Sequence, residues 1–134
     1  MSKLYNIIAV VLLMGGAAVQ AAETAGTEAA HKELFAIAAE GKEPSAEIAQ
    51  VPGRAPFYHI YDETGNLVEV LPNAYLANEV NIGPDMAALM ADRHVTVLVG
   101  GPVGPKMEDV MEERGIRFVF RKGVVQSVVD ELRK

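Results

Sequence analysis

Short apolar runs alternate with amphipathic segments in the C-terminal half of the chain, and this alternation constrains the fold most. Residues 95–99 (VTVLV) and 116–120 (IRFVF) are rich in β-branched and aromatic residues, as buried strands are. Three other segments carry apolar residues at helical spacing. They begin near Gly83-Pro84, near Gly104-Pro105 and at Val125. The alternation predicts an α/β fold with parallel strands joined by right-handed crossovers.

The first two predicted helices share a start sequence, IGPDM and VGPKM. Each predicts glycine at the cap and proline at the first helical position, where the missing N–H group costs nothing. Their apolar faces carry methionine pairs at i, i+4, namely Met86 with Met90 and Met107 with Met111. We interpret these pairs as core residues, and thioether binding of Cu(I) is the weaker alternative.

Upstream of these helices, the sequence predicts a β-hairpin. Residues 57–61 and 67–71 are strand-like, and DETGN at residues 62–66 supplies the turn. Residues 72–81 form a connecting loop. The preceding segment, HKELFAIAAEG at residues 31–41, is ambiguous, because its composition suits a helix and its apolar run suits a buried strand over residues 34–39. Residues 42–56 are rich in proline and predict a loop.

The N-terminus has the layout of a secretory signal peptide. Lys3 precedes an apolar run from Ile7 to Met14, and small residues lead to a predicted cleavage after Ala21. The run is too short to favour a stable membrane span, so an uncleaved anchor is the weaker alternative. We therefore expect a signal peptide at 1–21, a flexible N-terminus at 22–31, one domain at 32–134 and a periplasmic location.

The charge and cysteine content exclude several classes of function. The chain has 12 basic and 18 acidic residues, for a net charge of −6, and loss of Lys3 with the leader makes it −7. An acidic domain is a poor nucleic-acid binder, because phosphate contacts need clustered cations. With no cysteine, the chain has neither disulfides nor thiolate metal ligands.

The turn GGPVGPK between the strand at 95–99 and the second helix is the best candidate for a binding site. It includes Gly100, Gly101, Gly104 and Lys106 and lies beyond the carboxyl end of a strand, where open α/β sheets bind ligands. A helix start is already electropositive, so a lysine there suggests a bound anion. The alternative is a lysine that simply points into water. The spacing fits neither a P-loop nor a dinucleotide-binding motif.

Three stretches together resemble a known family. They are GRAPFYHIYDETGNLVEV, then IGPDMAALMADRHVTVLVGGPVGPKMEDVMEERGIRFVF, and finally KGVVQSVVDEL. Their order and spacing resemble the dinitrogenase iron–molybdenum cofactor biosynthesis family, from about Lys32 to the end. This chain departs from the family pattern at Pro52, where phenylalanine is usual, and at His94, where glycine is usual. Its predicted export is also unusual for the family.

The resemblance implies a ribonuclease H-like three-layer fold, in which a mixed five-stranded sheet carries helices on its faces and residues 34–39 form a strand. It implies a non-catalytic binding or carrier protein for an anionic metal–sulfur cluster or metal oxyanion. The cargo implied is iron–molybdenum cofactor or a molybdenum–copper sulfide cluster, exchanged with donor and acceptor proteins. The alternative is an exported protein–protein interaction domain that has lost the metal ligand.

Besides the glycine-rich turn, Gly53 and Arg54 are candidates for the same anion site, and a surface ion pair is the alternative role for Arg54. The weak metal-ligand candidates are His31, His59 and His94, which lack metal-binding spacing. A partly buried structural role suits His59, and a helix end suits His94. The carboxylates do not form a nuclease-like cluster and no nucleophile–base pair is evident, so we do not expect an enzyme.

Overall fold

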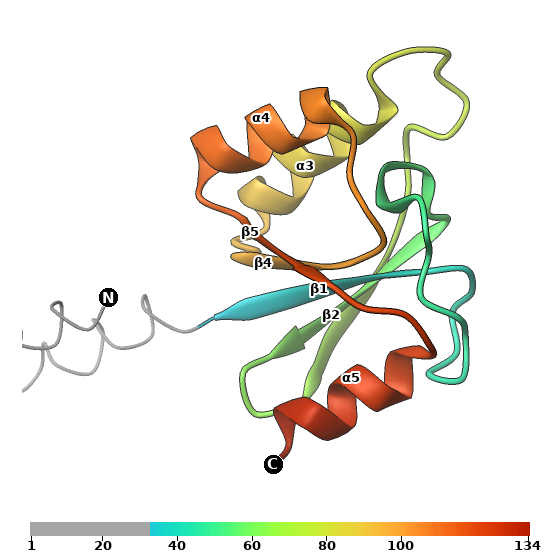
Figure 1. Ribbon diagram of the computed structural model, residues 1–134, viewed down its shortest axis with the longest axis vertical. Coiled ribbons are helices and arrows are strands. Elements are labelled where there is room, and N and C mark those ends of the chain that lie inside the picture. Colours follow the sequence, from blue (N-terminus) through green and yellow to red (C-terminus); the bar gives the residue numbers. More distant parts are fainter. Residues whose placement is uncertain (1–32) are drawn as a thin grey trace, which may run out of the picture. The chain divides into compact units, whose positions relative to one another are not determined.

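The computed structural model describes residues 33–134, which form an α/β domain (Figure 1). The predicted signal peptide, the predicted flexible N-terminus up to residue 31 and His31 lie outside the described residues. Within the described part of the chain, no helix has the length and apolar character needed to cross a membrane. The elements, in chain order, are β1 (Leu34–Ala39), η1 (Pro52–Arg54), β2 (Phe57–Asp62), β3 (Leu67–Pro72), α3 (Ile82–Asp92), β4 (Val97–Gly100), α4 (Pro105–Arg114), β5 (Arg117–Phe120) and α5 (Val125–Leu132).

The five strands form one mixed sheet in the order β3-β2-β1-β4-β5. β1, β4 and β5 are parallel neighbours, whereas β2 is antiparallel to both β1 and β3. The mixed five-stranded sheet expected from the resemblance is therefore confirmed, and the ribonuclease H-like label itself stays a prediction. The ambiguous segment at residues 34–39 is a strand. It occupies the centre of the sheet, and its last four residues are completely buried, which explains its continuous apolar run.

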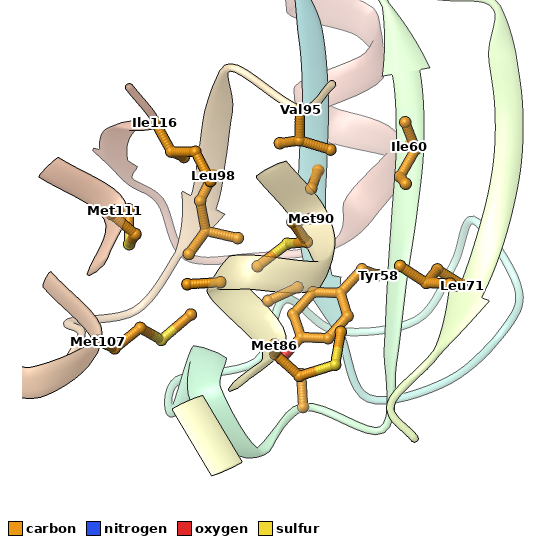
Figure 2. Close-up of a cluster of buried hydrophobic side chains, with 14 of the residues drawn as sticks. Tyr58, Ile60, Leu71, Met86, Met90, Val95, Leu98, Met107, Met111 and Ile116 are labelled. Atoms are coloured by element: carbon orange, nitrogen blue, oxygen red, sulfur yellow. The ribbon is translucent and has the colours of Figure 1, made fainter. Parts of the chain in front are cut away.

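Helices cover both faces of the sheet, with α3 and α4 on one side and α5 on the other (Figure 1). Four methionines of α3 and α4 pack with Tyr58, Leu71 and Leu98 in one apolar cluster (Figure 2). They are Met86, Met90, Met107 and Met111, and each is at most 3% exposed. Burying a methionine contributes about 1.5–3 kcal/mol to stability. The interpretation of these residues as core is confirmed.

The two similar helix-start sequences adopt different starts. In α4, Gly104 is the N-cap and Pro105 the first helical residue, as predicted. α3 begins two residues earlier than its proline suggests, with Asn81 as N-cap and Pro84 at the third helical position. Asn81 has φ 62°, a left-handed conformation that asparagine tolerates better than most residues. The N-cap of α3 is therefore Asn81, and not Gly83 as the sequence predicts.

The hairpin turn at residues 62–66 is closed by one carboxylate. Oδ1 of Asp62 accepts hydrogen bonds from the hydroxyl and N–H of Thr64, at 2.7 and 2.9 Å, and from the N–H of Asn66 at 3.0 Å. The Thr64 hydroxyl first, and then the Asn66 amide, hold the pKa of Asp62 below its ordinary value. The guanidinium of Arg133 donates to the Gly65 carbonyl, which ties the turn to the end of the chain.

Candidate anion-binding site

A cavity of about 440 Å³ lies where three segments of the domain meet. These segments are the η1 turn, the loop from β3 into α3, and the turn from β4 into α4. We call this cavity the helix-start pocket, because the N-termini of α3 and α4 both line it. Its lining comprises Val51, Gly53, Arg54, Glu79, Val80, Asn81, Ile82, Gly83, Pro84, Pro102, Gly104, Pro105, Lys106 and Met107.

Two glycines bring the pocket walls together. A Cβ atom on Gly53 would lie 3.0 Å from the Cα of Gly83 and 3.3 Å from the sulfur of Met107. A Cβ atom on Gly83 would lie 3.2 Å from the same sulfur. All three distances are tighter than ordinary van der Waals contact. The absence of side chains at these two positions therefore lets η1, α3 and α4 converge on one cavity.

Residues with uncapped backbone amides at the start of both helices line the pocket. Neither α3 nor α4 has a side-chain hydrogen bond at its N-cap. The first-turn N–H groups that lack a helical acceptor belong to Ile82 and Gly83 in α3, and to Lys106 and Met107 in α4. All four residues line the pocket. The remaining residue among the first three of each helix is Pro84 in α3 and Pro105 in α4, and proline has no N–H group. Two pairs of N–H donors and two helix dipoles therefore favour an anion in the pocket.

Two cationic side chains lie on the same walls. Arg54 comes from the η1 turn and Lys106 from the first turn of α4, and both are exposed. Among residues 33–134, no carboxylate lies within 4.0 Å of either cation. The surface ion pair considered for Arg54 is therefore not formed with any described residue. The pocket lining also includes one acid, Glu79, so its three charged side chains sum to one positive charge.

The structure places the predicted glycines in two groups. Gly53 and Gly104 line the pocket with Arg54 and Lys106. Gly100 and Gly101 are buried at the end of β4 and are not among the described lining residues. A Cβ atom on Gly101 would lie 2.4 Å from the Gln50 carbonyl oxygen, so this glycine serves the close packing of the loop that leads into η1. Sequence spacing does not distinguish a glycine that leaves room for a ligand from one that lets another backbone segment pack closely against it.

The η1 turn is held by two buried polar residues that the sequence analysis did not single out. The Tyr58 hydroxyl donates to the Pro52 carbonyl, and the Asn73 amide donates to the Ala55 carbonyl at 2.9 Å. Burial raises the pKa of Tyr58. The Asn73 side-chain oxygen in turn accepts the N–H of Tyr75 at 2.9 Å. These bonds fix the turn that carries Arg54. In the sequence, the only signal for Asn73 is the Pro72-Asn73 dipeptide, which is typical of a loop.

The histidines do not assemble a metal site in the described part of the chain. His59 is 1% exposed, and its Nε2 lies 2.8 Å from the Gly41 carbonyl oxygen, a structural role. His94 follows the end of α3 with φ 70°, and it ends the helix as expected. No group of three or more His, Cys, Asp or Glu side chains within residues 33–134 can hold a metal ion. The pocket therefore suits the outer surface of an anion and offers no ligand set for a bare cation.

Comparisons with known proteins agree with this architecture. The signature of the dinitrogenase iron-molybdenum cofactor family matches residues 33–134. The fold is similar to the apo orange protein of Desulfovibrio gigas, with 25% identity and a TM-score of 0.69, over 75% of this chain and 87% of that protein. It is also similar to a putative NifB protein from Thermotoga, with 29% identity and a TM-score of 0.62, over 73% and 84% respectively. No curated protein gives a significant match. The chain belongs to the dinitrogenase iron-molybdenum cofactor family.

Proposed function

We propose that this protein binds and carries an anionic metal–sulfur cluster or a metal oxyanion in the helix-start pocket. Family membership supports a small accessory protein that binds a cluster or cofactor. The observation that carries the proposal is the convergence of Arg54, Lys106 and two uncapped helix N-termini on one cavity. Guanidinium, ammonium and amide N–H groups all donate to oxo or sulfide atoms.

The proposed mechanism is capture and release without chemistry on the cargo. Within residues 33–134, the pocket lining has no imidazole, thiol or hydroxyl group, and the one thioether among these residues, Met107, is 3% exposed. The protein therefore holds the outer atoms of the ligand through charge-assisted hydrogen bonds, and no protein–metal bond has to break when the ligand leaves. Such bonds weaken with salt and with competing anions. Transfer therefore requires only that the acceptor protein binds the anion more tightly than this pocket does.

The identity of the cargo and the place of action are further parts of this proposal. Iron–molybdenum cofactor, a molybdenum–copper sulfide cluster and molybdate-like oxyanions all present the negative outer atoms that the pocket suits. The signal-peptide pattern at residues 1–21 supports periplasmic action, with donor and acceptor proteins in the same compartment. The acidic net charge argues against a nucleic-acid partner.

Metal analysis and a visible absorption spectrum of protein purified from its own host test the proposal first. We expect copurifying molybdenum, iron or copper. Tungstate binding by calorimetry then tests the site, and Arg54→Ala and Lys106→Ala should each weaken binding about tenfold, the loss of one charge-assisted hydrogen bond. Lys122→Ala, an exposed lysine outside the pocket lining, is the matched control. A metal-free protein that takes up neither tungstate nor thiomolybdate would refute the proposal.

The alternative is an exported interaction domain that binds no metal ligand. The observation that favours it is an apolar rim, because Val51 and Val80 line the pocket and are 57% and 69% exposed. This function predicts that a pull-down from envelope extract recovers a partner protein and that Val80→Ser abolishes the capture. It also predicts that Lys106→Ala changes no ligand affinity, which separates it from the carrier function.

A further inference from the structure

Glu79 is the one carboxylate in the lining of the helix-start pocket, within the part of the chain that the structure describes. It lies in the loop between β3 and α3, next to the exposed Val80 and three residues before the first residue of α3. A negative side chain is out of place in a cavity that otherwise favours anions. Because Coulomb energy depends on every charge on the walls, Glu79 opposes the ligand that Arg54 and Lys106 attract.

Glu79 does not hold the cations in place. No ion pair joins its carboxylate to Arg54, to Lys106 or to any other described base within 4.0 Å. Its side chain also forms no hydrogen bond with the described residues. Among the described residues, Glu79 therefore does not serve as the ion-pair partner of a pocket cation, and its carboxylate acts on the pocket through its charge.

The segment that carries Glu79 is weakly held. Residues 76–80 are all exposed, and their one backbone hydrogen bond within the described chain runs from the N–H of Asn78 to the Tyr75 carbonyl, at 2.9 Å. The segment is anchored before and after this stretch. Asn73 binds the η1 turn on one side, and the Asn81 carbonyl accepts the Asp85 N–H on the other. Few hydrogen bonds within the described chain therefore fix the position of Glu79 at the pocket.

We propose that Glu79 is a release and selectivity element, an acidic side chain in the lining of the helix-start pocket that repels the anionic cargo. This inference rests on the proposed anion-binding function. The carboxylate lowers affinity in proportion to the charge of the ligand, so it disfavours multiply charged oxyanions relative to singly charged ones of the same size. It also favours departure of the cargo, because its negative charge repels the bound anion.

Two tetrahedral oxyanions of similar size and different charge test this inference, namely tungstate, a dianion, and perrhenate, a monoanion. Calorimetric titration at pH 8 and 20 mM salt compares the natural protein with Glu79→Gln. Removal of one exposed charge should tighten perrhenate about twofold and, since the Coulomb energy doubles, tungstate about fourfold. Both gains should vanish in 0.5 M NaCl. Glu113→Gln, an exposed acid of α4 outside the pocket lining, is the matched control and should change neither affinity.

The outcomes separate this inference from the function on which it rests. A larger gain for tungstate than for perrhenate supports the role of Glu79. If the natural protein binds tungstate and Glu79→Gln binds it no more tightly, or tightens both ions equally, the role of Glu79 is overturned and the anion site stands. If neither protein binds either ion, the proposed function is overturned and this inference with it.

Discussion

Replacement of Gly104 by aspartate should make the domain more stable and should weaken anion binding in its pocket. Gly104 is the N-cap of α4, with φ −77° and ψ 165°, an extended conformation that any residue adopts. A Cβ atom there would meet nothing within 4 Å. The aspartate carboxylate would reach the uncapped N–H of Lys106 or Met107, the donors that we assign to the ligand.

Three contributions give the size of the stability gain. A capping side chain in place of glycine contributes a few tenths of a kcal/mol, and loss of glycine flexibility in the unfolded chain contributes about 0.5 kcal/mol. The negative charge at the helix start contributes about 0.5 kcal/mol. The total is about 1 kcal/mol, which raises Tm by roughly 4–8 °C for a domain of this size. Tungstate affinity should fall at least about tenfold, through lost donors and charge repulsion.

Differential scanning calorimetry and tungstate titration measure the two effects on the same protein. Gly104→Asn is the matched control, because it caps the helix without a charge. We expect it to keep most of the stability gain and to lose less affinity than the aspartate variant. A Gly104→Asp protein that is more stable and still binds tungstate like the natural protein would contradict our assignment of the α4 amides to the ligand.

Three further changes test how the site is built. Gly101→Ala should destabilise the domain by about 1–3 kcal/mol in chemical denaturation, because its Cβ would lie 2.4 Å from the Gln50 carbonyl oxygen; unchanged stability would refute the close packing. Asn73→Ala should cost about 1–3 kcal/mol and also weaken tungstate binding, since it frees the η1 turn; unchanged affinity would refute its positioning role. The lowered pKa of Asp62 stabilises the fold at neutral pH, and this contribution is lost as pH falls through the folded pKa. Thr64→Val should therefore flatten acid unfolding followed by circular dichroism, and an unchanged pH profile would contradict it.

The fold was largely predictable because its elements are locally consistent. The hairpin, the parallel strands and the three helices all form at or near the segments that the apolar pattern predicts. Residues 34–39 could not be assigned from the residues alone, since a fully buried central strand has no alternation that distinguishes it from a helix. The start of α3 was misplaced because Asn81 adopts a left-handed conformation that a local sequence pattern does not reveal.

The candidate site was only partly predictable, for a physical reason. Lys106 breaks a local rule at a helix start, and such an exception is visible in the sequence. That Arg54 and Glu79 line the same cavity depends on how three segments pack, which the sequence does not display. The burial of Gly100 and Gly101 depends on a loop some fifty residues away, so their role as packing positions appears only in three dimensions.

A crystal structure of the protein grown with tungstate tests the central claim most directly, because the anomalous signal of tungsten locates the ion without ambiguity. Our account predicts one tungstate in the helix-start pocket, within hydrogen-bond reach of Arg54, Lys106 and the first-turn amides of α3 or α4. A pocket that stays empty at millimolar tungstate, or one in which the Glu79 carboxylate occupies the cations in place of the ion, would contradict it.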